Sequence, residues 1–205
     1  MAIITMLCPP DLAKKLDIVR CTRMALVHDM AESLVGDITP VDGVSKAEKN
    51  RREAETMNYL CSGLLGNVHK GSGQAEAIRE VWQEYEDSKT PESIFVHDVD
   101  KMELLLQMME YERSHEGRVD LGEFVWVATR IETPEVKEWA QQLLKERETF
   151  WESTGKRPTG MTTSEVEDGR DGASAERKRQ QAEYYGNGHA KAPKLDPDGA
   201  EASMS

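Results

Sequence analysis

The sequence has few cysteines and no long apolar run, and each of these features excludes a class of protein. Its 205 residues include three cysteines, Cys8, Cys21 and Cys61, and no Cys-x-x-Cys spacing. An odd number without that spacing argues against a disulfide framework or a zinc ribbon and favours a reducing compartment, so we expect a cytoplasmic location. No stretch reaches the roughly eighteen apolar residues of a membrane-spanning helix, so we expect no membrane partner.

Basic residues are also in the minority. The chain has 26 Lys and Arg residues against 38 Asp and Glu residues, which gives a net charge of −12. A surface that binds a nucleic-acid polymer needs a basic footprint, so this balance excludes such a polymer as the expected partner. One short basic run, Arg177-Lys178-Arg179, is a candidate nuclear signal, although a solvated tail is the simpler interpretation of it.

Large apolar residues become rare after Glu152, and this change predicts a domain boundary. Residues 153–205 are rich in Gly, Ser, Thr, Pro and mixed charge. Such a segment buries too little apolar surface to offset its ordering entropy, so we expect a disordered tail. The expected division is a folded domain at 1–152 and a tail at 153–205.

Apolar residues in the first part recur at helical spacing and predict an all-α domain. Ser45 and Glu48 form a capping box, and Thr90-Pro91 and Thr133-Pro134 each place proline at a helix start. No segment shows clear alternation of period two, so no sheet is expected. The expected helices cover residues 1–7, 11–35, 45–65, 74–87, 90–114, 120–130 and 133–150.

One stretch of the second helix, residues 26–37, holds a histidine and three carboxylates among apolar neighbours. His28 and Glu32 are four residues apart and Asp29 and Glu32 three apart, so each pair is expected on one helix face. Asp37 follows just past the expected helix end. Burying these groups unpaired would be costly, so we expect them to bind a metal or one another.

The wider sequence around these residues resembles the HD-domain metal phosphohydrolases. Within them it is most similar to the eukaryotic HD-domain-containing protein 2 group, which is in turn similar to the bacterial 5′-deoxynucleotidases. The resemblance covers roughly residues 1–150. It is carried by the strings Arg23–Glu32, Val35–Pro40, Glu48-Lys49, Arg51-Arg52-Glu53, Phe95-Val96, Asp100, Glu110-Tyr111-Glu112 and Pro134-Glu135.

The resemblance implies an HD-domain helical bundle that holds a divalent metal cation. The family's ligands carried over to this chain are His28, Asp29 and Asp100. Spacing alone would not select this set, because adjacent side chains diverge by about 100° around a helix. Imidazole and carboxylate ligands suit Mn, Co, Mg, Fe or Zn, so the metal is not identified.

The resemblance also assigns catalytic and substrate roles. Glu32 matches the family's catalytic acidic residue, and Asp37 matches the residue that positions water or substrate. These two carboxylates, with the backbone carbonyl of Ile38, are candidates to hold a second metal. Arg51 and Arg52 are candidates to contact a substrate phosphate, with a solvated or salt-bridged face as the open alternative.

The implied activity is hydrolysis of a deoxyribonucleoside 5′-monophosphate to deoxynucleoside and phosphate by a homodimer. Two alternatives stay open. One is a catalytically dead helical remnant that binds a nucleotide or a protein partner, and the other is a phosphodiesterase acting on cyclic or alarmone nucleotides. Metal content together with phosphate release from a deoxynucleoside monophosphate separates the three.

The chain departs from the family pattern at its start. The family's first metal-binding histidine lies on a helix upstream of Met1, so the resemblance implies an N-terminally truncated, incomplete first helix and impaired activity. His97, three residues before Asp100, is the candidate substitute. Its neighbour Asp98 is expected to face solvent.

Overall fold

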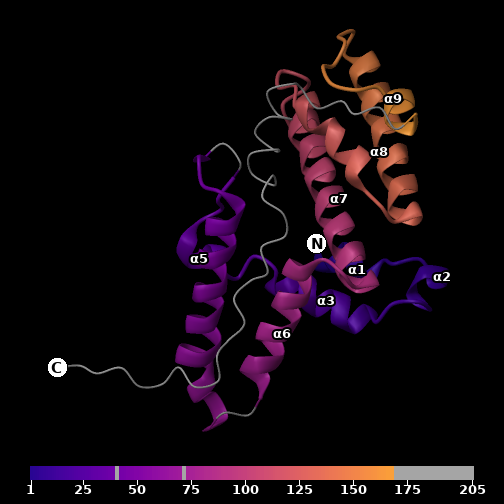
Figure 1. Ribbon diagram of the computed structural model, residues 1–205. Coiled ribbons are helices and arrows are strands. Elements are labelled where there is room, and N and C mark those ends of the chain that lie inside the picture. Colours follow the sequence, from indigo (N-terminus) through magenta and orange to yellow (C-terminus); the bar gives the residue numbers. More distant parts are fainter. Residues whose placement is uncertain (40–41, 71–72, 169–205) are drawn as a thin grey trace.

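In a computed structural model, the described residues are 1–39, 42–70 and 73–168, and within these ranges the chain forms helices without any strand. The predicted all-α fold is therefore confirmed. Figure 1 shows their arrangement, with α5 on one side of α7 and α8 with α9 on the other. The elements are α1 (Ala2–Met6), α2 (Pro10–Ala13), α3 (Ile18–Val27), α4 (Glu32–Val35), α5 (Lys46–Asn58), η2 (Tyr59–Leu64), η3 (Leu65–Lys70), α6 (Gln74–Asp87), α7 (Pro91–Ser114), η4 (Gly122–Arg130), α8 (Pro134–Ser153) and α9 (Thr163–Glu167).

The long helix α7 is the centre of the fold, and α1, α3, α6, α8 and η4 all pack against it. Its start is specified locally. The Thr90 hydroxyl accepts a hydrogen bond from the Ser93 backbone N–H, and the Ser93 side chain accepts one from the Thr90 backbone N–H. Pro91 occupies the first turn, where a missing N–H costs nothing. The predicted boundaries of α6, α7 and α8 are confirmed to within a few residues.

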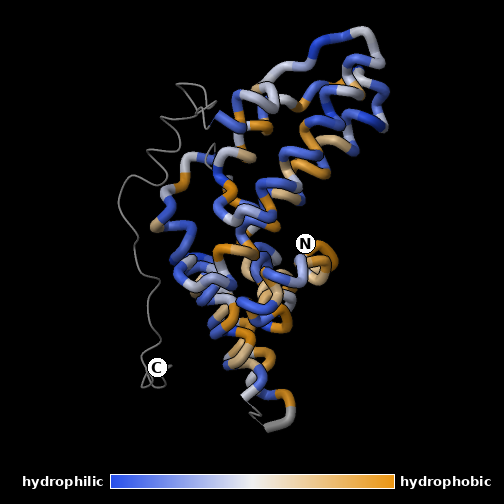
Figure 2. The backbone as a smooth tube through the Cα atoms, turned by 90° about the vertical axis from the view of Figure 1, so that its right-hand side faces the viewer, coloured by the Kyte–Doolittle hydropathy of each residue, from blue (hydrophilic) through white to orange (hydrophobic). Residues whose placement is uncertain are grey.

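Two apolar clusters stabilise the helices. The main one surrounds α7 and joins α3, α6, η4 and α8, and the smaller one lies between α5, η2 and α6. Figure 2 shows hydrophobic and hydrophilic residues interspersed along the long helices, as expected where one face is buried. Cys21, Cys61 and Met109 are all buried in these clusters.

The prediction of one continuous helix over residues 11–35 is wrong, because the helix is interrupted twice. At the first break the Asp17 side chain accepts a hydrogen bond from the Arg20 backbone N–H and begins α3 as a new helix. The second break covers residues 28–31, where the hydrogen bonds from Met30 to Val27 and from Glu32 to Asp29 span three residues. This tighter winding changes the direction in which the following side chains point.

A tryptophan from another helix stabilises the second break. Trp82 on α6 is buried, and its indole Nε1–H donates a hydrogen bond of 3.1 Å to the backbone carbonyl of His28. Where α3 ends, this carbonyl lacks a helical partner, and an unpaired carbonyl beside the core would be costly. Only the tertiary structure assigns Trp82 this hydrogen bond.

Two other elements differ in type from the prediction. The helix that begins at Ser45 is α-helical to Asn58 and continues as the π-helix η2, and residues 122–130 form a 3₁₀ helix. No described helix is both long enough and apolar enough to cross a membrane.

The chain after residue 152 is ordered further than its composition predicts. The Glu148 carboxylate accepts hydrogen bonds from both the backbone N–H and the hydroxyl of Thr163, which begins α9. Gly122 and Gly160 pass so closely that a Cβ on Gly122 would lie 1.9 Å from a backbone oxygen of Thr159. Disorder from residue 153 is therefore wrong up to Asp168, while residues 169–205 lie outside the described part.

Candidate active site

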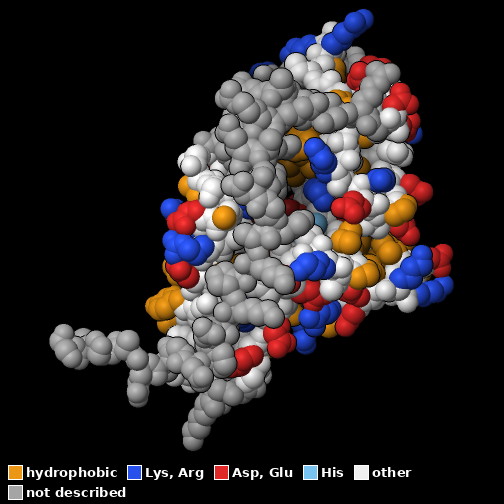
Figure 3. Space-filling model, in the orientation of Figure 1, with side chains coloured by type: hydrophobic (Ala, Val, Ile, Leu, Met, Phe, Trp, Pro, Cys, Tyr) orange, Lys and Arg blue, Asp and Glu red, His pale blue; other side chains and the backbone are white. Residues whose placement is uncertain are grey.

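The charged residues of the 28–37 stretch line one side of a cleft of about 860 Å³. Its other walls come from α5, α6, α7 and the end of η4. In Figure 3 a histidine side chain is visible in a hollow bordered by acidic and basic side chains. The lining residues are His28, Asp29, Glu32, Asp37, Lys46, Lys49, Asn50, Glu53, Tyr85, Glu86, Ser88, Ile94, His97, Asp100, Lys101, Arg130 and Glu132.

His28 is held by groups that both accept hydrogen bonds. Its Nδ1 lies 3.2 Å from the Ala25 carbonyl, and its Nε2 lies 2.8 Å from Asp29 Oδ2. Both partners accept hydrogen bonds, an arrangement that favours the protonated ring, in which both nitrogens donate. Burial opposes this charge, but the hydrogen bond and charge of Asp29, with the charge of Asp100, outweigh it and raise the pKa of His28.

Two carboxylates of the cleft are held in surroundings that disfavour their charge. Burial, and the nearby charge of Asp29, raise the pKa of Asp100, although His28 opposes the shift. Burial and the charges of Asp29 and Asp37 raise the pKa of Glu32. Seven carboxylates line the cleft against four Lys and Arg side chains. The cleft thus concentrates negative charge beyond what its own cations neutralise.

Tyr85 and His97 form a buried aromatic wall beside His28. The ring of Tyr85 stacks on His97 at 3.9 Å and meets His28 edge-on at 5.3 Å. Burial lowers the pKa of His97 to about 4, so its ring is neutral near pH 7. Its Nε2 lies 3.0 Å from the Tyr85 carbonyl and must carry the ring proton, which leaves only Nδ1 with a lone pair.

One face of α5 forms the opposite wall. Lys46, Lys49, Asn50 and Glu53 recur at helical spacing and all line the cleft. The Nζ atom of Lys49 lies 3.6 Å from Glu32 Oε1 and 3.5 Å from Glu53 Oε1. Sequence reasoning assigned no role to this face, although the start of the helix was predicted at Ser45, whose side chain accepts a hydrogen bond from the Glu48 backbone N–H.

The two arginines predicted to contact substrate lie outside the cleft. Arg51 is ion-paired with Glu48 at 2.8 Å and with Glu55 at 2.6 Å, and Arg52 is ion-paired with Glu48 at 2.7 Å. They form the salt-bridged outer face that was the open alternative. Ile38 is buried and does not line the cleft, whereas Asp37 is exposed and does.

The expectation that Asp98 faces solvent is wrong. Its side chain is fully buried, and Oδ2 accepts hydrogen bonds from the backbone N–H groups of Glu132 and Thr133. Lys101 donates to Oδ1 at 2.9 Å. Asp98 therefore joins α7 to the start of α8, where unpaired N–H groups need an acceptor.

The donor types of the cleft fit a divalent cation. His28, Asp29 and Asp100 supply one imidazole and two carboxylates from two elements, and the surplus negative charge favours a cation. Within residues 1–39, 42–70 and 73–168, no three His, Cys, Asp or Glu side chains are already arranged to hold an ion. A cation at His28 Nε2 would replace the proton directed at Asp29. The metal ligands therefore stay a prediction.

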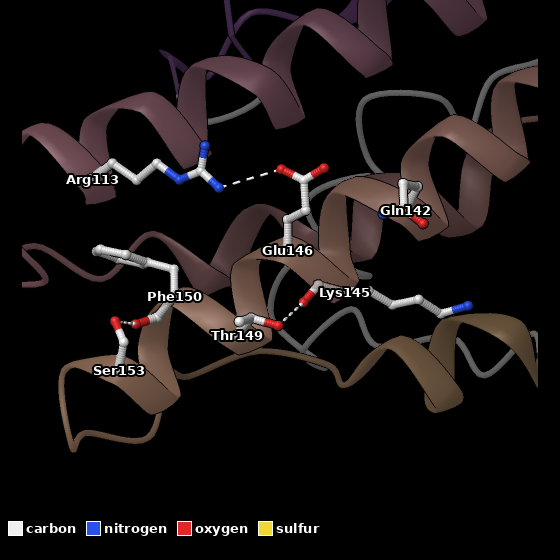
Figure 4. Close-up of a pocket in the computed structure, with 7 residues that line it drawn as sticks. All are labelled: Arg113, Gln142, Lys145, Glu146, Thr149, Phe150 and Ser153. Atoms are coloured by element: carbon white, nitrogen blue, oxygen red, sulfur yellow. Dashed lines mark hydrogen bonds and ion pairs between the residues drawn. The ribbon is translucent and has the colours of Figure 1, made fainter.

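A second hollow, of about 430 Å³, lies between α7 and α8 and differs in chemistry. Figure 4 shows Arg113 reaching from α7 towards Glu146 on α8, an ion pair of 3.3 Å. The Thr149 hydroxyl donates to the Lys145 carbonyl within α8. These groups interact with one another along the rim, and no histidine is among them. The charged cleft is therefore the candidate active site.

Comparison with known proteins identifies relatives of the chain. A family model described as HD domain matches residues 1–140, which include every predicted site residue. The 5′-deoxynucleotidase hdd1 of Schizosaccharomyces pombe is 49% identical over 155 residues, 75% of each chain. The 5′-deoxynucleotidase YGK1 of Saccharomyces cerevisiae is 44% identical over 140 residues, 68% of this chain and 64% of that protein.

A human relative and a solved structure extend the comparison. The 5′-deoxynucleotidase HDDC2 of Homo sapiens is 37% identical over 150 residues, 73% of this chain and 69% of that protein. The solved structure of the HD domain-containing protein YGK1 is 38% identical, covers 74% of each chain and superimposes with a TM-score of 0.60. The chain therefore belongs to the HD-domain family, in the branch formed with these 5′-deoxynucleotidases.

Proposed function

We propose that this chain is a metal-dependent 5′-deoxynucleotidase, which hydrolyses deoxyribonucleoside 5′-monophosphates to deoxynucleoside and phosphate. The observation that carries the proposal is that His28, Asp29, Glu32 and Asp100 line one cleft. Their chemistry suits phosphoryl hydrolysis, and the similar proteins named 5′-deoxynucleotidase supply the substrate class.

His28, Asp29 and Asp100 would hold the divalent cation. When bound, the cation supplies Lewis-acid chemistry, polarising a phosphoryl oxygen and lowering the pKa of water. The surplus of carboxylates around the cleft supports this assignment, because an isolated anionic cluster is costly and a cation neutralises it.

Glu32 and Asp37 are the residues assigned to water and protons. The pKa of Glu32 is raised by burial and by Asp29 and Asp37, which brings this carboxyl closer to the range of a working general base. Asp37 is exposed at the cleft and orients water or substrate. These two carboxylates, with the Ile38 carbonyl, remain the proposed second metal site.

The test uses the full chain, loaded in turn with Mn, Co, Mg, Fe and Zn. We expect about one divalent ion per site and phosphate release from dAMP. His28→Ala and Asp29→Ala should lose the metal, measured by elemental analysis, whereas Glu32→Ala should keep the metal and lose turnover. Retained turnover in Glu32→Ala would remove its catalytic role.

The same assay decides between the alternatives. A chain that holds no metal and releases no phosphate, yet binds dAMP in calorimetry, would be the catalytically dead remnant. A metal-loaded chain that cleaves cyclic or alarmone nucleotides and leaves dAMP intact would be a phosphodiesterase. Either result contradicts the 5′-deoxynucleotidase proposal.

We also propose a homodimer in a reducing compartment such as the cytoplasm. Exposed apolar side chains at α1 and on α3 support a contact with a second copy; they include Ile3 (75% exposed) on α1, Leu7 (68%) just after it and Leu26 (67%) on α3. The three cysteines are free, which supports reducing surroundings. The mass in solution by light scattering and the location of a fluorescent fusion test both statements.

A further inference from the structure

We propose that Lys49 is a positioning residue for the carboxylate of Glu32, with Glu53 as the anchor that holds Lys49 in place. This inference rests on the proposed function, because Glu32 is the residue to which that function assigns the handling of protons. Sequence reasoning gave neither Lys49 nor Glu53 a role, and the structure gives each a specific contact.

The contacts form a bridge between two helices. The single ammonium group of Lys49 lies 3.6 Å from Glu32 on α4 and 3.5 Å from Glu53 on its own helix, α5. The side chains are 19%, 24% and 5% exposed, so solvent screens the bridge only in part. A positive charge between two carboxylates at these distances favours a fixed position for both.

Glu32 needs such support because its own helix provides little. Helix α4 has four residues, none of them buried, and no side chain caps its start at Ala31. A helix this short is not stable alone, so its orientation comes from its contacts with α5. Asp29 and Asp37 repel the Glu32 carboxylate, whereas His28 and Lys49 attract it. Of these two attracting groups, Lys49 comes from α5.

Glu53 serves as the anchor because it is buried and four residues from Lys49. Side chains at this spacing lie on one helix face, here the face that lines the cleft. Glu53 is 4% exposed, and a carboxylate at that depth requires a cationic partner. Glu86 on α6 adds a second negative charge beside Glu53. The ammonium of Lys49 is thereby held on the α5 side of the cleft.

The first experiment separates positioning from direct contact with substrate. In Lys49→Met we expect kcat for dAMP to fall at least about tenfold while KM and metal content change little, as for other residues that orient catalytic groups. Lys49→Arg retains the charge and should recover kcat to within about threefold. A large rise in KM with unchanged kcat would overturn the proposal, because Lys49 would then bind the substrate itself.

The matched control is another lysine that bridges two helices. Lys145 on α8 lies 3.4 Å from Glu167 on α9, outside the cleft. Lys145→Met should change kcat less than about twofold, since it removes an inter-helix ion pair that is more exposed and lies away from the cleft. An equal loss of kcat in both variants would show a general effect of removing helix bridges and would overturn the proposal.

Two double mutants test whether Lys49 affects kcat through Glu32 and Glu53. In a Glu32→Gln background, Lys49→Met should cause no further loss of kcat, because its action passes through Glu32. Glu53→Gln alone should lower kcat by about threefold to tenfold, and combining it with Lys49→Met should add nothing. Effects that multiply in either pair would overturn the proposal.

A measurement without activity separates this inference from the proposed function. Urea unfolding of the metal-free wild type, Lys49→Met, Glu32→Gln and their double mutant should show non-additive midpoints. If the midpoints are non-additive but the wild type releases no phosphate, the Lys49–Glu32 bridge is supported and the 5′-deoxynucleotidase proposal is rejected. An active wild type with additive midpoints and an unchanged kcat in Lys49→Met would reject the positioning role alone.

Discussion

Within the described residues, the charged cluster between α7 and α8 and the charged cleft are balanced differently. Between α7 and α8, Glu112 and Arg147 are almost fully buried and joined by hydrogen bonds of 2.8 and 2.9 Å. The indole of Trp151 and the backbone N–H of Leu121 donate to the same carboxylate, and Asp120 accepts from Arg147. In the cleft, by contrast, carboxylates outnumber Lys and Arg side chains.

The difference indicates that the cluster between α7 and α8 stabilises the fold, whereas the charged groups of the cleft can take part in binding or catalysis. In the α7–α8 cluster, hydrogen bonds from Gly122 and Thr159 overcome burial and lower the pKa of Asp120. In the cleft, burial raises the pKa of Glu32, Glu86 and Asp100. Ionised carboxylates there lack sufficient compensation, so a cation binding in the cleft would relieve the repulsion.

The largest effect on activity is expected from removing a carboxylate from the charged cleft. Asp100→Asn should reduce phosphate release by on the order of a thousandfold, because the loss of a proposed metal ligand would remove several kcal/mol of transition-state stabilisation. The metal-free variant should be at least as stable as the wild type, since an unfavourable buried charge is removed. Activity assays and thermal melts measure both, with Asp87→Asn, an exposed residue of α6, as the control.

A substitution in the cluster between α7 and α8 should lower stability and leave activity unchanged. Arg147→Met leaves the Glu112 carboxylate buried without its cation, which should lower the free energy of unfolding by about 3–5 kcal/mol. The remaining folded protein should keep its kcat, since the cluster lies outside the cleft. Urea denaturation checks the first statement and single-substrate kinetics the second.

A double replacement refines this expectation. Glu112→Leu with Arg147→Leu should restore only part of the stability, because the Trp151 indole and the Leu121 backbone N–H lose their acceptor. If Arg147→Met unfolds at the same urea concentration as the wild type, the cluster does not have the structural role inferred from its contacts.

Glu86 provides a pH-dependent comparison. Burial and the charge of Glu53 raise its pKa from 4.5 to about 7, against the attraction of Lys49, Lys46 and Arg79. The folded state therefore holds this proton more tightly than the unfolded state does. Its contribution is fully present below about pH 4.5 and is lost as the pH rises through about 7, by up to about 3 kcal/mol.

Replacing Glu86 with Gln removes the titration while retaining most of the shape. The variant should therefore be more stable than the wild type at pH 8, and the difference should shrink towards pH 4.5. Urea unfolding at a series of pH values measures this difference. A wild-type–variant difference that stays constant between pH 4.5 and 8 would show that Glu86 titrates normally.

The smallest of these effects is expected at the helix break before α4. Trp82→Phe keeps the aromatic bulk but removes the hydrogen bond to the His28 carbonyl, so stability should fall by about 1–2 kcal/mol. Because the break aims the site residues, kcat should fall as well, which hydrogen exchange at residues 28–32 and kinetics can test. An unchanged exchange rate would mean that other contacts fix the break.

Helix positions could be predicted wherever the chain carries local signals. Thr90-Pro91 and the apolar spacing that follows fix α7, because capping and burial act within a few residues of sequence. The same reasoning failed for residues 11–35. The helix is interrupted at Asp17 by a new N-cap, and the interruption at residues 28–31 depends partly on a hydrogen bond from Trp82, which is 54 positions away from His28.

In the candidate site, too, some features could be predicted from the sequence and others depend on packing. His28, Asp29, Glu32, Asp37 and Asp100 could be named from their resemblance to a family, and they line one cleft in the structure. Arg51 and Arg52 are equally polar and near in sequence, yet their ion pairs with glutamates place them outside it. Which face of α5 meets the cleft is a matter of packing, which residue type does not encode.

The sequence by itself determined the helical class and most helix boundaries, because caps and helical spacing are local properties, while its resemblance to a family supplied the proposed site residues. The tertiary structure alone decided that Lys49 joins Glu32 to Glu53, that Asp98 is buried at the start of α8, and that the chain up to Asp168 packs on the bundle. Those contacts join residues distant in sequence or set by packing, and their energies depend on burial and distance that only the folded chain defines.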